Sequence, residues 1–268
     1  MTVREELASG RLDQAIEAAY ADVRARPLDH DARGLLLDLL CFTSQWDRAF
    51  KQIDVIEAGG ADPRVGVYRG LIEAERARQR FFAVGERMPG WLVAPPAWMA
   101  DHLAGCDLLR RGEPESARVL LKQAEAALPD LEVRLGDVRF DGFRNLDDRL
   151  GPILEIMTPS GYTWIPWEDI EFLDVSAPVV PRDLLWVPAR LASCHGPLAR
   201  VFVPALYPGT SLESDGTLRL GRETRWRDLG AGLAQGLGLQ TFLAGEESRT
   251  IMELNNMRFK QKHVPESK

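Results

Sequence analysis

The sequence has few of the residues that build metal and redox centres. Its 268 residues include only three cysteines, which lie far apart and lack the Cys-x-x-Cys spacing of a zinc or redox site. The four histidines include no pair at metal-ligand spacing. We therefore predict reduced thiols in or near the core, no bound metal and no organic cofactor. The residues concerned are Cys41, Cys106, Cys194, His30, His102, His195 and His263.

Excess basic charge and long apolar runs are missing too. The formal net charge is -7, whereas proteins that bind phosphate backbones use clustered cations to displace counterions. Nucleic acid is therefore not expected as a partner. No apolar run approaches the roughly 18 residues that span a membrane, and the N-terminus lacks the apolar core of a signal peptide. We expect no membrane insertion and a cytoplasmic location.

Two groups of arginines stand out in this acidic chain. Acidic residues are interspersed in both groups, so the pattern predicts solvated faces with local ion pairs rather than an anion site. The groups are Arg76, Arg78, Arg80 with Glu73 and Glu75, and Arg219, Arg222, Arg225, Arg227 with Glu223 and Asp228.

Signatures of catalysis are weak. The glycines between positions 230 and 238 match neither the dinucleotide fingerprint nor a phosphate loop, and no Ser lies in a Gly-x-Ser-x-Gly context. Asp147 and Asp148 either hold a cation or bond Arg149 and backbone amides. We favour the second, because the segment lacks the alternating oxygen ligands of a calcium loop. The only polar residues that we can nominate for an active site are these two aspartates, His195 and Arg222. We predict no catalytic site.

The first half of the chain contains a repeat. Segments 10–15, 44–49 and 112–117 align on Ala15, Ala49 and Ala117, with spacings of 49−15=34 and 117−49=68 residues, which is twice 34. This is the period of tetratricopeptide repeats, in which a small residue lets two antiparallel helices approach closely. Residues 1–130 are therefore predicted to form a tetratricopeptide-like domain of at least five helices in consecutive antiparallel pairs, with these alanines buried.

The repeat is interrupted once. Ala83 occupies the expected position, but Phe81 and Phe82 precede it and a Pro-rich segment with Trp91 and Trp98 follows it. The two tryptophans either fill the core or mark a binding edge. An array of about three units leaves a short groove that suits an extended or helical peptide.

Beyond residue 130 the helical pattern gives way to short β-rich runs separated by Pro and Gly, which predicts a β-rich α+β domain over residues 131–268 with an antiparallel sheet. Hairpin turns are expected at 158–161 and 214–216. The fold class is thus α+β with two domains, which we expect to pack against one another. The predicted strands are Ile153–Met157, Tyr162–Ile165, Leu184–Val187, Arg200–Val203, Leu218–Leu220, Leu239–Leu243 and Arg249–Leu254.

Four aromatic and proline motifs follow one another in the second half. They are YTWIPW from Tyr162, RDLLW from Arg182, PALYPG from Pro204 and LGRETRW from Leu220. Together with FRNLDDRLGPILEI at 143–156 and GLGLQTFLAGE at 236–246, this series resembles the bacterial ImpE family, also called TagJ or SciE-type proteins.

The resemblance implies a function as well as a fold. Members of that family are non-enzymatic accessory components of type VI secretion systems, associated with the N-terminal helix of the small contractile-sheath subunit TssB. They are linked through the sheath to the disassembly ATPase ClpV, in sheath assembly or recycling. The alternative left open by the repeat is a general tetratricopeptide-type adaptor or chaperone unrelated to secretion.

The aromatic residues of these motifs are either core or anchors for a partner, because Trp, Tyr and Arg dominate interface energetics. The candidate partner-binding residues are Trp91, Trp98, Trp164, Trp167, Trp186, Tyr207, Arg222 and Trp226.

Overall fold

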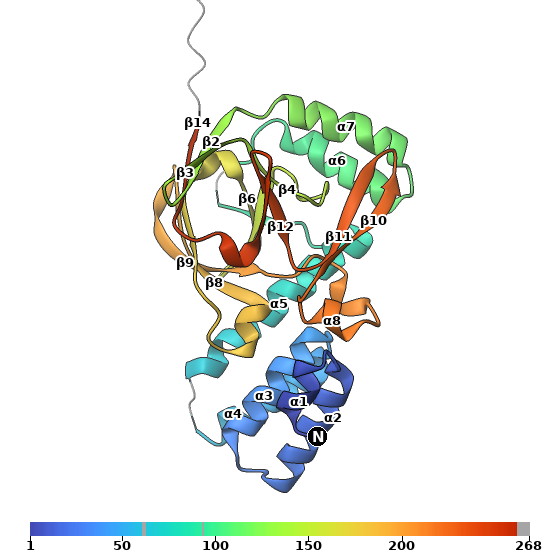
Figure 1. Cartoon of the computed structure of the whole chain (residues 1–268), viewed down its shortest axis with the longest axis vertical. Helices are drawn as coiled ribbons and strands as arrows, with labels where there is room; N and C mark the ends of the chain where they lie inside the picture. Colours follow the sequence, from blue (N-terminus) through green and yellow to red (C-terminus); the bar gives the residue numbers. More distant parts are fainter. Residues whose placement is uncertain (61–62, 93, 262–268) are drawn as a thin grey trace, which may run out of the picture.

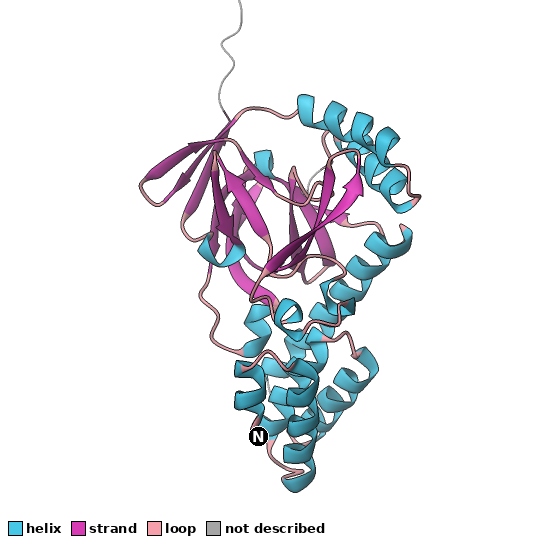
Figure 2. Cartoon of the chain, turned by 45° about the vertical axis from the view of Figure 1, so that its right-hand side comes forward, coloured by secondary structure: helices cyan, strands magenta, loops and turns pink. Residues whose placement is uncertain are grey.

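Helices form one end and one flank of the molecule, and strands fill the rest (Figures 1 and 2). The computed structural model describes residues 1–60, 63–92 and 94–261. The α+β class is therefore confirmed. The α-helices of this described part are α1 (Val3–Ala8), α2 (Leu12–Ala25), α3 (His30–Phe42), α4 (Trp46–Ala58), α5 (Pro63–Val84), α6 (Met99–Arg110), α7 (Pro114–Ala126) and α8 (Gly216–Arg219).

Most strands belong to one large sheet with the order β1-β6-β5-β9-β8-β7-β14-β2-β3. Its neighbouring strands are antiparallel, as predicted, except for the parallel pair β1–β6. Its strands are β1 (Gly90–Trp91), β2 (Leu131–Leu135), β3 (Val138–Asp141), β5 (Ile153–Thr158), β6 (Gly161–Pro166), β7 (Ile170–Val175), β8 (Trp186–Ser193), β9 (Gly196–Pro204) and β14 (Met257–Gln261).

Two smaller sheets complete the β region. One is the ribbon β10 (Thr224–Gly230) with β11 (Leu233–Gly238), and the other has the order β13-β12-β4. The strands of the second are β4 (Phe143–Asn145), β12 (Thr241–Ala244) and β13 (Glu247–Thr250), and the 3₁₀ turns are η1 (Trp167–Asp169), η2 (Pro181–Leu184), η3 (Thr210–Leu212) and η4 (Ile251–Glu253).

The first helices begin and pack as their sequence dictates. Thr2 and Glu5 form a capping box at the start of α1, and Asp29 caps α3. Ala15, Ala49 and Ala117 are completely buried, so the predicted burial of these small residues is confirmed. Helices α1 to α4 pack in consecutive pairs, and α6 packs on α7.

Helix α5 separates these two groups of helices (Figure 1). It contacts α4, β6 and α6. The short strand β1, which follows it, adds to the edge of the large sheet beside β6. A tetratricopeptide arrangement and a domain boundary at residue 130 stay predictions.

Three local predictions are wrong. The predicted strand Arg249–Leu254 is extended only to Thr250, and Ile251–Glu253 form the 3₁₀ turn η4. Residues 218–220 are not a strand, and 214–216 is not a hairpin turn. Instead Asp215 accepts hydrogen bonds from the amides of Thr217 and Leu218 and caps the short helix α8, because an Asp followed by Gly can cap a helix as readily as it makes a tight turn. The predicted hairpin at 158–161 is confirmed by the antiparallel pairing of β5 with β6.

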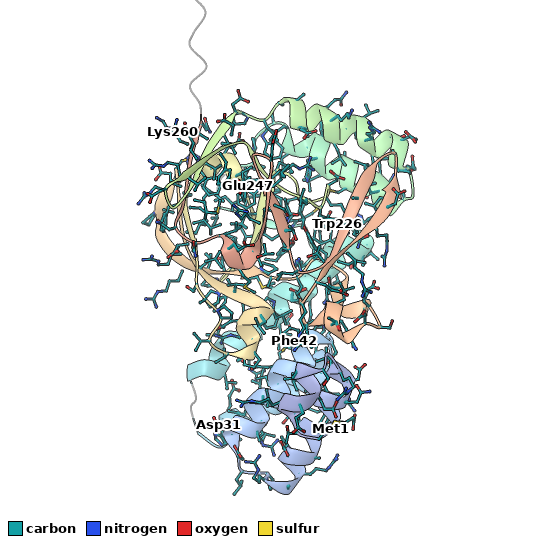
Figure 3. All side chains as sticks on the ribbon, in the orientation of Figure 1. Met1, Asp31, Phe42, Trp226, Glu247 and Lys260 are labelled. Atoms are coloured by element: carbon teal, nitrogen blue, oxygen red, sulfur yellow. The ribbon has the colours of Figure 1, made fainter. Side chains whose placement is uncertain are left out.

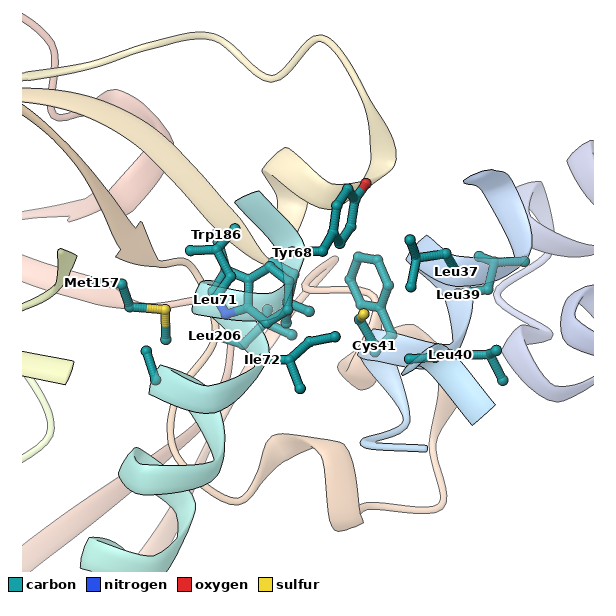
Figure 4. Close-up of a cluster of buried hydrophobic side chains, with 14 of the residues drawn as sticks. Leu37, Leu39, Leu40, Cys41, Tyr68, Leu71, Ile72, Met157, Trp186 and Leu206 are labelled. Carbon is teal, nitrogen blue, oxygen red and sulfur yellow. The ribbon is translucent and has the colours of Figure 1, made fainter. Parts of the chain in front are cut away.

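The helical and β-rich parts share one hydrophobic core. Leu71 and Ile72 of α5 lie between Cys41 of α3 and Trp186 and Leu206 of the β region (Figure 4). The largest cluster of buried apolar residues therefore runs from α1 to the strands, and the prediction that the two parts pack against one another is confirmed. A second cluster lies within the β region, around Trp167 and Phe242.

Ala49→Phe tests the close helix contact on α4. Ala49 is completely buried, so a phenyl ring there overpacks the helix pair, and we expect a loss of about 1 to 3 kcal/mol in the free energy of unfolding. Val55→Phe is the control, because Val55 lies on the same helix with 45% of its surface exposed. Urea denaturation measures both, and equal unfolding midpoints for the two variants would contradict the packing.

Candidate partner-binding groove

A buried arginine joins α5 to the β region. The Arg78 side chain is only 3% exposed, which corrects the prediction of a solvated face for this member of the arginine group. Its guanidinium donates two hydrogen bonds to the Glu155 carboxylate, at 2.8 and 2.7 Å, and one to the Leu206 carbonyl at 2.9 Å. A further bond of 3.1 Å reaches Glu75 one turn earlier on α5. One side chain thus connects α5 to β5 and to the segment after β9.

The motifs of the second half supply the rest of this network. Tyr162 donates from its hydroxyl to Glu155 at 2.5 Å, and Trp186 donates from Nε1 to Glu75 at 3.2 Å. Gln240 donates to Glu155 at 3.1 Å and to the Pro204 carbonyl at 2.9 Å. A polar group that is buried without a hydrogen-bond partner costs free energy. These bonds therefore favour one position of α5 on the strands.

The charge of Arg78 is fixed by its surroundings. Burial by itself lowers the pKa of a guanidinium, but the carboxylates of Glu155 and Glu75 outweigh it and raise the pKa of Arg78 above its ordinary value. Arg78 therefore stays charged across the range in which proteins work.

Asp147 and Asp148 form structural hydrogen bonds, which is the interpretation favoured from the sequence. Asp147 is completely buried and receives hydrogen bonds from the Arg149 guanidinium at 2.9 and 2.6 Å and from the Gly236 amide at 3.0 Å. Asp148 accepts from the Ala234 amide at 2.7 Å and from Arg144 at 2.7 Å. Both carboxylates are used to hold the β4–β5 connection against β11, which confirms the structural interpretation.

The other nominated polar residues engage separate partners. His195 lies in the exposed β8–β9 turn with Nε2 3.3 Å from Asp169, and Arg222 donates to the carbonyls of Leu7 and Ala8. In the described part of the chain, no group of three or more His, Cys, Asp or Glu residues is arranged to hold a metal ion. Within the same residues, no helix combines the length and apolarity needed to cross a bilayer.

Five of the eight candidate partner-binding residues are buried. Trp98, Trp164, Trp167, Trp186 and Tyr207 are at most 6% exposed, and each belongs to a core cluster. The Trp164 ring packs edge-on against Phe81, with ring centroids 5.1 Å apart. These five side chains therefore hold the fold together and leave little surface for a partner.

Three of the candidates reach the surface. Trp226 on β10 is 46% exposed and packs edge-on against Tyr207, with ring centroids 5.7 Å apart. It stands opposite Gly236 in the ribbon, where any larger residue would collide with the Tyr207 ring. Figure 3 labels Trp226 on this ribbon. Arg222 is exposed and Trp91 half-buried.

A groove of about 800 Å³ opens between the C-terminal half of α5 and the segment that contains η3, and none of the eight candidate residues lines it. The sequence pattern does not predict this groove, because its two walls lie more than 100 residues apart in the chain. Its lining residues are Trp46, Arg76, Gln79, Arg80, Phe82, Ala83, Val84, Arg149, Pro208, Gly209, Ser211, Leu212, Glu213, Arg227 and Gln235.

Apolar side chains lie on both walls of this groove. Val84 at the end of α5 is 64% exposed, and Leu212 on the opposite wall is 84% exposed. Trp46 and Phe82 are half-buried, and both also pack against the main core. An exposed apolar surface of this kind marks an interaction site more often than an isolated surface leucine does.

Hydrogen bonds fix the positions of the two walls. Gln79 on α5 donates to the Ser44 hydroxyl at 2.8 Å, and Ser44 donates to Ser211 in η3 at 2.8 Å. Gln79 also accepts from Trp46 Nε1 at 3.3 Å. The groove is therefore preformed, which lowers the entropy cost of binding.

Arg78→Met tests the buried junction. Removing one partner of a buried ion pair leaves the carboxylates uncompensated, and we expect a loss of about 3 to 5 kcal/mol in the free energy of unfolding. Arg76→Met is a matched control on the same helix, because the ion pair that Arg76 forms with Glu73 is exposed, with an expected loss below about 1 kcal/mol. Similar urea midpoints for the two variants would contradict this interpretation, and Glu155→Gln provides an independent variant of the same junction.

Two buried groups predict a specific pH dependence. Burial raises the pKa of Asp38 to about 6, against the opposing effects of the Tyr68 hydroxyl and Arg182, and burial lowers the pKa of His102 to about 4. The raised pKa of Asp38 stabilises the fold fully below pH 3.8, which is the ordinary pKa of the group. This stabilisation is lost as the pH rises through 6. The lowered pKa of His102 stabilises the fold fully above pH 6.5, which is the ordinary pKa of the group. This stabilisation is lost as the pH falls through 4.

The two effects, each about 3 kcal/mol, oppose one another between about pH 4 and 6. Relative to wild type, stability of Asp38→Asn should therefore rise with pH in this window, whereas that of His102→Gln should fall. Urea midpoints at three pH values measure both slopes. Variants that follow the wild-type slope would show that neither group titrates as described.

Comparisons with known proteins agree with the motifs. The ImpE protein family model matches residues 137–258. The type VI secretion system accessory component TagJ of Pseudomonas aeruginosa is 34% identical over 261 residues, which cover 97% of this chain and 91% of that protein. The crystal structure of protein VPA1032 from Vibrio parahaemolyticus has the same fold, with a TM-score of 0.88 at 23% identity over 97% of this chain and 98% of that one. The chain belongs to the ImpE/TagJ family.

Proposed function

We propose that this protein is a non-enzymatic accessory component of a bacterial type VI secretion system and acts in the cytoplasm. Its partner is the small sheath subunit TssB, whose amphipathic N-terminal helix it binds. Through the sheath it is linked to assembly or to recycling by ClpV. The relative from Pseudomonas aeruginosa, named as an accessory component of such a system, supports the general role.

The observation that carries the binding function is the preformed groove on α5. It is open to solvent, has apolar side chains on both walls and is wide enough to enclose about 800 Å³. An amphipathic helix binds such a surface by laying its apolar face into it. The polar residues that an enzyme would need are instead committed to structural bonds, as with Asp147 and Arg149.

The proposed mechanism is equilibrium capture without chemistry. Val84 and Leu212 are exposed in the free protein, and a bound helix would remove both from water, with about 25 cal/mol gained per Å² of apolar surface. A short helix in a preformed groove typically reaches micromolar affinity, about −8 kcal/mol.

Calorimetry with the isolated N-terminal helix of TssB from the same secretion gene cluster tests this function. We expect micromolar binding that falls only modestly as salt rises, because apolar contact supplies most of the energy. The control is a TssB that lacks the helix, which should not bind. Equal binding with and without the helix, or none with either, would contradict the proposal and favour a general repeat adaptor.

A further inference from the structure

The rim of the groove is basic in a chain that is acidic as a whole. Four arginines line the groove and only one acidic residue, Glu213, accompanies them, while the formal charge of the whole protein is -7. Local charge of the opposite sign to the rest of the surface steers a partner of complementary charge. The positive charge of the groove therefore indicates an occupant that carries negative charge.

The four arginines differ in how far they are already paired. Arg149 is 11% exposed and forms a close pair with Asp147, and Arg227 bonds Glu213 at 2.8 Å. Arg76 has one exposed pair with Glu73 at 3.0 Å. Arg80 is exposed, and no residue in the described ranges forms a hydrogen bond or ion pair with it.

Arg76 and Arg80 are also unfavourably placed with respect to one another. They lie four residues apart on α5, so both project from the same helix face, where like charges repel. Val84 follows after another four residues and continues this line to the end of the helix. A ridge of two cations and one exposed apolar residue thus runs along one wall of the groove.

We propose that the occupant of this groove is an amphipathic helix whose apolar stripe is flanked by carboxylates. Its apolar side chains contact Val84 and Leu212, and its Asp or Glu side chains pair with Arg80 and Arg76. This inference rests on the proposed function and specifies the site on this chain and the chemistry of the partner. Apolar contact supplies most of the affinity, and the arginines select the acidic flank and fix the direction of the helix.

Fluorescence anisotropy with the full chain tests the inference. The probes are the labelled N-terminal segment of TssB from the same gene cluster and a copy with its Asp and Glu replaced by Asn and Gln. For the native segment, Arg80→Glu should weaken binding about 3- to 10-fold, and Leu212→Asp should weaken it at least about 10-fold. Arg24→Glu makes the same charge change on α2 at an exposed position that does not line the groove, and should leave binding unchanged.

The neutral segment separates charge from apolar contact. It should bind the wild-type protein about 3- to 10-fold more weakly than the native segment and should not distinguish wild type from Arg80→Glu. Leu212→Asp should still weaken it. Arg80 and Leu212 are exposed, so both variants are expected to keep the wild-type unfolding midpoint, which circular dichroism checks.

The outcomes distinguish this inference from the proposed function. If the native segment binds wild type and every variant equally, the groove is not the site, and the inference is wrong while the function stands. If only Leu212→Asp weakens binding, the site is right and the acidic flank is wrong. If neither the segment nor intact TssB binds the wild-type protein, the function and the inference both fail.

Discussion

The fold depends on one buried ion pair. Arg78 lies on α5, Glu155 on β5, and the two bonds between them, at 2.8 and 2.7 Å, join segments 77 residues apart in the chain. Both charges are removed from water, so their net contribution to stability depends on complete hydrogen bonding around them. Tyr162, Gln240 and Glu75 provide it.

The same helix presents a second face to solvent. Glu75 and Arg78 point into the junction, whereas Arg76 and Arg80 line the groove. The pitch of an α-helix, 3.6 residues per turn, separates these two sets. Because the junction holds α5 in one position on the strands, it also fixes the wall of the groove relative to η3. The structural and the proposed binding roles of α5 therefore depend on one another.

Local features of the fold could be predicted from the sequence. The buried Ala15, Ala49 and Ala117 follow from a 34-residue spacing, and the β5–β6 hairpin follows from its turn residues. The aromatic motifs identified the family, and a position in the core was one of the two alternatives given for their aromatic side chains. Prediction was wrong at residues 218–220, where a cap by Asp215 produced a helix instead of a strand.

Long-range contacts could not be predicted. Arg78 lies in the same short stretch of sequence as Arg76 and Arg80. Its partners Glu155 and Leu206, 77 and 128 positions away, make it a buried residue. A helical wheel centred on Glu75 and Arg78 could have separated them from their neighbours. The groove is equally non-local, since Ser44 and Ser211, which fix its walls, are 167 residues apart.

Hydrogen exchange of the full chain with and without the TssB helix tests the central claim most directly, namely that α5 and the η3 segment form one preformed binding site. Added protection of backbone amides is expected in residues 76–84 and 208–213, with no change in α1 and α2. Protection confined to the faces of α1 to α4, or to the β3 edge of the large sheet, would contradict it.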